Sequence, residues 1–227
     1  MQGPAVIFGA SGGIGAALAD ATEAQGYAPV LRLSRTHGDF DLTDEASIAA
    51  CAARVAQIGA PRLILIATGL LSTPDTGPER AIRHIDQDWM LHNFAINAVG
   101  PALILKHMTP LLPKQGRAVV AALSARVGSI SDNRLGGWHS YRASKAALNM
   151  LVKGAALELA RTRPDALCVT LHPGTVATGL SAPFRTAAAQ GVLPPAQAAD
   201  HLLRVLDGLD PTHSGRCFGW DGAEIPA

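Results

Sequence analysis

Residues 5–15 read AVIFGASGGIG. The first four are apolar and two of them are β-branched, which predicts a short buried strand. A glycine-rich turn follows, and the helix formers of residues 16–20 come directly after it. In this order the backbone can bend sharply, and a pyrophosphate can approach the N-terminus of the helix. A glycine turn can be no more than a turn, but its place at the first junction of strand and helix favours nucleotide binding.

Segments typical of strands and of helices alternate along the rest of the chain. Further strands are expected over residues 29–35, 39–42, 62–67, 117–124, 167–172 and 215–222. Helices are expected over residues 45–58, 86–112, 141–161 and 195–209, with Thr43 or Asp44 capping the first and Gly100-Pro101 kinking or dividing the second. Residues 179–195 are predicted to form a mobile flap. The alternation predicts one α/β domain over residues 1–227, a Rossmann-type, doubly wound, mostly parallel sheet of about seven strands with helices on both faces.

Composition narrows the range of partners. The 227 residues include 19 Lys plus Arg and 18 Asp plus Glu, a balance that does not favour binding to nucleic acid or to an anionic membrane. No apolar run reaches the ~20 residues that span a bilayer. The three cysteines are far apart and show neither a disulfide framework nor a metal-binding spacing. With no signal peptide expected, these features predict a cytoplasmic protein without a metal site.

Tyr141 and Lys145 lie four residues apart in a segment rich in helix formers. On a helix these positions lie one above the other, so the phenol and the ammonium would share a face. A nearby cation favours the phenolate and lowers the pKa of a tyrosine from its usual ~10, which suits proton exchange at neutral pH. Taken alone the pair is weak, because many helices carry a packed tyrosine one turn from a solvated lysine.

The exit of the strand at residues 29–35 indicates which dinucleotide would bind. An acidic residue at this exit holds the 2′-hydroxyl of an adenosine ribose, whereas an arginine suits a 2′-phosphate. This chain has Ser34 and Arg35 there, so NADP(H) is favoured over NAD(H), although Arg35 can also be an ordinary surface residue. Asp41, a little further on, is either a turn residue or an acceptor for the adenine amino group.

Seven short motifs in a fixed order give the chain a family resemblance. From Gly9 to Gly222 it resembles the short-chain dehydrogenases/reductases, and residues 128–149 are similar to the branch that contains C-factor-like signalling proteins and carbonyl-reductase relatives. The motifs are Gly9-x-x-x-Gly13-Ile14-Gly15, Asp41-Leu42, Ala67-Thr68-Gly69, Asn97-Ala98-Val99-Gly100, Ser124, Tyr141-x-x-x-Lys145 and Pro173-Gly174-x-Val176-x-Thr178. Each motif is weak alone, and their order makes the set specific.

The resemblance implies hydride exchange between a nicotinamide and the carbon of a small carbonyl or alcohol. Tyr141 would transfer the proton on oxygen, and Lys145 would lower the pKa of Tyr141 and hold the nicotinamide ribose. Ser124 would hydrogen-bond the substrate oxygen, and Asn97 would anchor a water that leads protons to Lys145. Residues expected to bind the cofactor are Gly9, Ser11, Gly13, Ile14, Gly15, Ser34, Arg35, Asp41, Leu42, Ala67, Thr68, Gly69, Pro173, Gly174, Val176 and Thr178.

The chain departs from the family pattern in four places. The family serine commonly lies three positions before a glycine, here Gly128, and that position holds Ala125. Ser124 would then enter the site through a local backbone shift, or Ser129 would replace it, or the serine role would be weaker. Thr68 stands where asparagine-alanine is common, and Gly12 replaces a basic residue of many NADP-preferring relatives. The short segment 179–195 implies an open, permissive substrate pocket.

Two functions remain open at this stage, with a third, another reaction on the same scaffold, behind them. The first is an oxidoreductase that acts on a small carbonyl or secondary alcohol. The second is a C-factor-like signalling or nucleotide-binding protein with little turnover. A homodimer or homotetramer is also expected, because the helices that carry Asn97 and Tyr141 are rich in apolar residues. These include Ala146, Ala147, Leu148, Leu151, Val152, Ala155, Ala156 and Leu159.

Overall fold

The computed structural model describes residues 2–184 and 191–227, which form a seven-stranded sheet in the order β2-β1-β3-β4-β5-β6-β7. All neighbouring strands are parallel except β6 and β7. The predicted doubly wound, mostly parallel sheet is confirmed. The strands are β1 (Ala5–Phe8), β2 (Val30–Leu33), β3 (Leu63–Ile66), β4 (Ala118–Leu123), β5 (Ala166–His172), β6 (Cys217–Gly219) and β7 (Glu224–Ile225).

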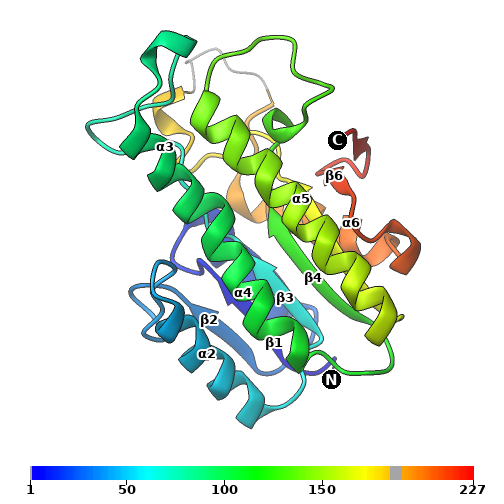
Figure 1. Ribbon diagram of the computed structural model, residues 1–227. Coiled ribbons are helices and arrows are strands. Elements are labelled where there is room, and N and C mark those ends of the chain that lie inside the picture. Colours follow the sequence, from blue (N-terminus) through cyan, green and yellow to red (C-terminus); the bar gives the residue numbers. More distant parts are fainter. Residues whose placement is uncertain (1, 185–190) are drawn as a thin grey trace.

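Helices cover both faces of the sheet (Figure 1). One face packs against α1 (Gly13–Ala24) and α6 (Pro195–Gly208), and the other against α2 (Glu45–Ile58), α4 (Gly100–Met108) and α5 (His139–Thr162). Both faces of the central strands are therefore buried, which explains why their sequences are apolar without alternation. In β1, for example, all four side chains are buried, with Val6 and Phe8 in one core cluster and Ala5 and Ile7 in the other.

The strand predicted at residues 39–42 is wrong. Asp39 has a left-handed backbone with φ of 50°, and side chains satisfy the amides that a strand would have paired. The amide of Asp41 donates to Ser47 Oγ at 2.9 Å, and the amide of Thr43 donates to Asp41 Oδ1 at 2.8 Å. Local side-chain bonds of this kind compete with a sheet ladder. The seventh strand is instead β7, at the opposite edge of the sheet.

The long helix predicted over residues 86–112 is interrupted before Gly100-Pro101 and not at it. It consists of α3 (Gln87–Phe94), a π-helical turn (Ala95–Val99), α4 and a 3-10 turn (Thr109–Leu111). Pro101 lies in the first turn of α4, where its missing N–H is tolerated. Gly100 has a different role, because a Cβ there would lie 2.5 Å from Leu42 Cγ, so the glycine permits close packing against Leu42.

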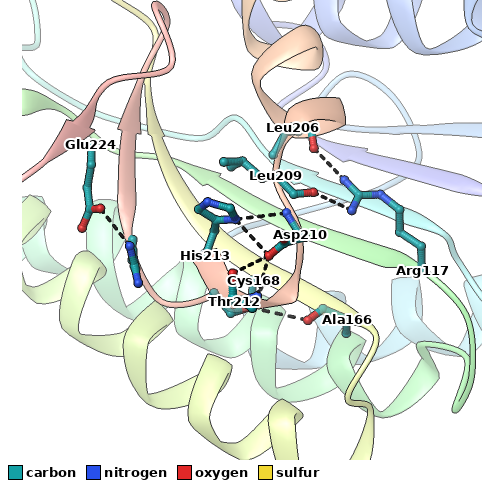
Figure 2. Close-up of polar contacts among 11 residues, drawn as sticks. Arg117, Ala166, Cys168, Leu206, Leu209, Asp210, Thr212, His213 and Glu224 are labelled. Carbon is teal, nitrogen blue, oxygen red and sulfur yellow. Dashed lines mark hydrogen bonds and ion pairs between the residues drawn. The ribbon is translucent and has the colours of Figure 1, made fainter.

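Capping contacts explain where two of the predicted helices begin and end. Of the two expected caps of α2, Asp44 is the one used, since its side chain accepts from the amide of Ala46 at 2.9 Å. Figure 2 shows the guanidinium of Arg117, which donates to the carbonyl oxygens of Leu206 at 2.6 Å and Leu209 at 2.7 Å. This contact satisfies carbonyls at the C-terminal end of α6 and joins α6 to the start of β4.

Two sequence predictions concern features beyond the sheet. The flap predicted over residues 179–195 includes a 3-10 turn at Ala182–Phe184, and residues 185–190 lie outside the described residues. Within the described ranges, no helix is both long enough and apolar enough to cross a membrane. A cytoplasmic location stays a prediction.

Candidate active site

A cavity of about 420 Å³ opens at the carboxyl ends of β1, β3, β4 and β5. Ligands bind at this edge of a doubly wound sheet because the loops that follow the strands meet there. The cavity brings together twelve of the predicted site residues: Ser11, Gly13, Ile14, Gly15, Ala67, Thr68, Gly69, Ser124, Tyr141, Lys145, Pro173 and Thr178. It is also lined by Gly12, Leu123, Gly179 and Leu180, which the sequence motifs did not single out.

The glycine turn forms one wall of the cavity. Gly9 has a φ of +81°, a backbone angle that residues with a side chain rarely adopt. A Cβ on Gly15 would collide with the carbonyl oxygen of Gly9. Glycine is therefore required at both positions for α1 to begin this close to the end of β1. No side chain caps the N-terminus of α1 at Gly12. The free amides of the first turn and the helix dipole together make this wall suitable for an anion.

Tyr141 and Lys145 lie in the first two turns of α5, and both are almost fully buried, with 8 % and 3 % of their surfaces exposed. The Lys145 Nζ lies 5.8 Å from the centroid of the Tyr141 ring and donates to the carbonyl oxygen of Leu123 at 2.8 Å. The predicted pair therefore shares one face of the helix. Because Leu123 ends β4, its bond to Lys145 also ties α5 to the sheet at the edge of the cavity.

The predicted lowering of the pKa of Tyr141 is not found. Burial raises the pKa of Tyr141 to about 12, and burial lowers the pKa of Lys145 to about 8. Both shifts favour the neutral form, because a buried charge loses its hydration. The ammonium is held at the Leu123 carbonyl, so its effect on the phenol is smaller than the effect of burial. Tyr141 is consequently protonated at neutral pH.

Asn97 joins three parts of the site from the π-helical turn. Its Nδ2 donates to the carbonyl of Leu70 at 2.8 Å, and its Oδ1 accepts from the amide of Leu70 at the same distance. Nδ2 also donates to Ser144 Oγ on α5 at 3.1 Å. A Cβ on Gly69 would lie 3.6 Å from Lys145 Nζ and 3.7 Å from Asn97 Oδ1, so both groups flank the same point. Asn97 therefore holds the loop at Leu70 against the helix that carries Tyr141 and Lys145.

The two candidate serines lie in different surroundings. Ser124 lines the cavity, is 4 % exposed, and has an Oγ without a hydrogen-bond partner among the described residues. Ser129 is also buried, but its Oγ accepts from the amide of Asp132 at 3.1 Å, and it borders a separate hollow of about 200 Å³. A short 3-10 turn, Arg126–Gly128, separates them. The geometry favours Ser124 over Ser129 for contact with a substrate.

The other predicted cofactor residues lie outside this cavity, and their role stays a prediction. Ser34 is buried and its Oγ accepts from the amides of Thr36 and His37, while Arg35 is exposed. Asp41 bonds Thr43, whose hydroxyl and amide lower the pKa of the Asp41 carboxyl, with a minor contribution from Arg35. This favours the turn interpretation of Asp41. Three more predicted cofactor residues, besides Gly9, make packing contacts. Leu42 packs at Gly100, a Cβ on Gly174 would contact Trp220, and Val176 is buried beside Leu193.

The order of motifs in the sequence agrees with a family-level match. Residues 36–189 match the family described as short chain dehydrogenase. The chain belongs to this family. Its members are oxidoreductases, which agrees with a cavity that joins a glycine turn to a buried tyrosine and lysine.

Two curated relatives, a C-signal and a dehydrogenase, show the different kinds of protein to which this member of the family is similar. The chain is 40 % identical over 147 residues to the C-signal of Myxococcus xanthus, a match that covers 64 % of this chain and 83 % of the relative. It is 33 % identical over 183 residues to 1-hydroxy-2-glutathionyl-2-methyl-3-butene dehydrogenase of Rhodococcus, covering 80 % of this chain and 76 % of the relative. The resemblance to the C-factor-like branch is confirmed by the first of these.

Solved structures of other dehydrogenases and reductases share the fold. An NADPH-bound carbonyl reductase from chicken fatty liver superimposes with a TM-score of 0.85 at 24 % identity, over 99 % of this chain and 98 % of the other. The carbonyl reductase Sniffer of D. melanogaster superimposes with a TM-score of 0.81 at 21 % identity, over the full length of both chains.

The residues of this dehydrogenase fit a nicotinamide dinucleotide. The uncapped N-terminus of α1 and the glycines beside it suit the pyrophosphate. Gly13 is close enough to Thr178 that a Cβ would lie 2.8 Å from Thr178 Cγ2, so the backbone there is open to a ligand only as glycine. Thr68 Oγ1 and Ser124 Oγ are buried without partners among the described residues, as donors reserved for a ligand would be.

No group of three or more His, Cys, Asp or Glu in residues 2–184 and 191–227 could hold a metal ion.

His172, at the end of β5, is a titratable residue near the site that belongs to none of the sequence motifs, although its place at the carboxyl end of a predicted strand puts it at the ligand-binding edge. Its Nδ1 is buried without a partner among the described residues. Burial, and next Arg126, lower the pKa of His172 to about 4, with Asp221 acting in the opposite direction. The imidazole is therefore neutral in the folded protein at pH values where an unfolded histidine, with a pKa of 6.5, is already charged.

Between pH 6.5 and 4 the unfolded chain binds a proton at His172 that the folded chain does not. The stability contributed by the neutral imidazole is complete above pH 6.5 and is lost as the pH falls, by up to roughly 3 kcal/mol. We expect His172→Gln to flatten the acid side of a plot of unfolding free energy against pH, measured by urea denaturation. His84→Gln, at an exposed histidine, is the control. Identical acid slopes for wild type and His172→Gln would contradict this account.

Proposed function

We propose that this protein is an NADP(H)-dependent reductase of small, uncharged carbonyl compounds, with Tyr141 as the proton donor. The observation that carries the proposal is that the Tyr141 phenol, the Lys145 ammonium and the Ser124 hydroxyl line one cavity beside the glycine turn, and that the Ser124 hydroxyl has no partner among the described residues. This is the constellation that carbonyl reduction needs: a proton donor, a group that orients it and a hydrogen bond to the substrate oxygen.

The state of Tyr141 supports reduction at neutral pH. With its pKa raised to about 12 by burial, the phenol holds the proton that a carbonyl oxygen accepts when it becomes an alcohol. When bound, the nicotinamide dinucleotide supplies the hydride that goes to the carbonyl carbon. Ser124 Oγ is free to donate to the same oxygen. Lys145 remains held at the Leu123 carbonyl and keeps a positive charge near the developing phenolate.

The lining of the cavity supports an uncharged substrate. Among its described residues Lys145 is the one charged side chain, and it is already bonded to the Leu123 carbonyl. Aromatic rings lie close to the reacting phenol. The ring centroids of Trp138 and Tyr141 are 6.3 Å apart in an edge-on arrangement, and those of Phe184 and Trp138 are 5.4 Å apart. Rings at this place favour an apolar substituent on the carbonyl carbon. The water implied at Asn97 stays a prediction, because both side-chain atoms of Asn97 already bond Leu70.

Replacing the proton donor tests the proposed chemistry. Tyr141→Phe keeps the ring and removes the proton, so we expect kcat/KM for a panel of aldehydes and ketones to fall about 10²–10⁴-fold. Ser124→Ala should fall about tenfold or more through the lost hydrogen bond. Ser129→Ala, at the serine outside the cavity, should stay near wild type. NADPH oxidation followed at its absorbance maximum measures all four proteins, and equal turnover by wild type and Tyr141→Phe would exclude the proton-donor role.

The similarity to C-signal supports a second candidate function, that of a signalling or nucleotide-binding protein. A signalling or nucleotide-binding protein would bind NADP(H) but reduce no carbonyl in the same panel. The complete set of Asn97, Ser124, Tyr141 and Lys145 favours the reductase, since binding alone does not require a proton donor. Absent turnover by the wild type together with retained NADP(H) affinity would favour the signalling function.

The preference for NADP(H) rests on Arg35, an exposed cation just beyond β2. A guanidinium there can pair with a 2′-phosphate without the cost of burial. We expect Arg35→Ala to weaken NADPH binding about tenfold and to leave NADH binding unchanged, as measured by titration of nicotinamide fluorescence. Arg83→Ala, at an exposed arginine in the loop before α3, is the matched control. Equal affinities of wild type for NADPH and NADH would contradict the preference.

Assembly into a homodimer or homotetramer is supported by the outer side of α4 and α5. A groove of about 590 Å³ lies between these helices, and its lining includes Leu105, Met150 and Leu151. Met150 is 71 % exposed, a large apolar surface for a helix in water. Leu148, Val152, Ala156 and Leu159, also expected to meet a symmetry mate, instead face the sheet.

We expect light scattering to report a dimer or tetramer for wild type. Met150→Lys should shift the mass toward the monomer by placing a charge on the apolar surface. A wild-type monomer at assay concentration would contradict assembly.

A further inference from the structure

Glu79 is a buried acid that has no role in the site described so far. It lies in the loop between β3 and α3, and only 6 % of its surface is exposed. No lysine, arginine or histidine of the described residues forms an ion pair with it within 4.0 Å. Buried carboxylates without a cation are rare because they lose their hydration, so such a group needs strong hydrogen bonds from other donors.

Those donors come from the N-terminus of the helix that carries Tyr141 and Lys145. The amide of Ser140 donates to both carboxylate oxygens of Glu79, at 3.1 Å and 3.3 Å, and the Ser140 hydroxyl donates to one of them. The backbone is joined as well, since the amide of Trp138 donates to the carbonyl oxygen of Glu79 at 2.5 Å. Ser140 is fully buried and immediately precedes Tyr141.

The helix has no cap of its own at this end. Trp138, in the capping position of α5, has a left-handed backbone with φ of 52° and makes no side-chain cap. The first amides of a helix need acceptors, and the helix dipole favours a negative charge beside them. Glu79 meets both needs from a distant loop. The same loop is held at Leu70 by Asn97, which also bonds Ser144 one turn further along α5.

We propose that Glu79 is a positioning residue for the reaction: its carboxylate fixes the first turn of α5 and thereby sets the direction of the Tyr141 phenol. This rests on the proposed function, in which Tyr141 donates the proton. Without the carboxylate, the amide and hydroxyl of Ser140 lose their acceptor and the first turn of α5 can fray. The bond from the Trp138 amide to the Glu79 carbonyl is a main-chain contact and stays, so removal of the carboxylate acts through Ser140 on the turn that carries Tyr141.

Two substitutions of Glu79 separate the effect of its hydrogen-bond acceptor on the position of α5 from the effect of its negative charge. Glu79→Gln keeps a carbonyl oxygen that can accept from Ser140, whereas Glu79→Ala removes both acceptors. We expect kcat for carbonyl reduction to fall about 10–100-fold in Glu79→Ala, with NADPH affinity within about twofold of wild type, and to recover to within about threefold in Glu79→Gln. Asp44→Ala, which removes the cap of α2, a helix that contributes no residue to the cavity, controls for loss of a helix cap in general and should keep wild-type kcat.

A double-mutant cycle tests whether Glu79 acts through Tyr141. If it does, Glu79→Ala should cost little further activity in a Tyr141→Phe background, because the proton donor it positions is already gone. A full additional loss in that background would overturn the proposal, as would unchanged kcat in Glu79→Ala. Glu79→Gln as poor as Glu79→Ala would overturn it too, provided that thermal unfolding finds both variants folded.

Hydrogen exchange gives an answer that does not depend on turnover. The amides of Ser140 and Tyr141 should exchange about tenfold faster in Glu79→Ala than in wild type, whereas the amides in the middle of α5 should not change. Unchanged exchange at Ser140 would overturn the proposal even if the protein reduces no carbonyl. Failure of the proposed function, which the wild type and Tyr141→Phe report, is thus distinguished from failure of the positioning role.

Discussion

The bond between Lys145 Nζ and the carbonyl of Leu123 is the interaction on which the site depends. It joins the helix that carries Tyr141 to the end of a central strand, and it gives a buried ammonium an acceptor. Without that acceptor a charge at this depth would be expelled or neutralised. Since Ser124 follows Leu123 directly, the same bond fixes the spacing between the phenol, the ammonium and the serine hydroxyl.

Around this bond, loops are held by side chains that satisfy buried backbone groups. Asn97 pairs with Leu70 in both directions, and Glu79 accepts from Ser140, so the loop between β3 and α3 is fastened at two points. Each contact satisfies a backbone group that would be costly to bury alone. The result is a site whose polar groups are positioned before a substrate arrives, which is the arrangement that lowers reorganisation during proton transfer.

Burial also determines the protonation states of the titratable side chains near the cavity. Tyr141, Lys145 and His172 are all shifted toward their neutral forms, each with burial as the largest cause. A protonated phenol and a neutral imidazole suit a reaction in which one proton leaves the protein for a carbonyl oxygen. The lysine is closest to its transition at neutral pH, so its charge is the one most readily adjusted by a bound ligand.

The sequence alone determined the parts of this protein that are local. Residues 5–15 predicted the strand, the glycine turn and the start of α1. A cap at Thr43 or Asp44 marked the start of the helix predicted at residues 45–58, and the spacing of Tyr141 and Lys145 placed them on one helical face. Hydrophobic period, capping and glycine geometry act over a few residues, so they can be read without the fold. Motif order was enough to indicate the family and the kind of chemistry.

Only the tertiary structure decided the features that depend on residues distant in the chain. It separated Ser124 from Ser129, because what distinguishes them is access to a cavity formed by four strands. It replaced the strand at residues 39–42 with side-chain-bonded turns, moved the break in the long helix to a π-helical turn, and reversed the expected shift in the pKa of Tyr141. The contacts of Glu79 with Ser140 and of Asn97 with Leu70 span 61 and 27 residues, and burial is a property of the whole packed chain. Such contacts and depths arise from the long-range packing of the sheet and its helices, which no local pattern specifies.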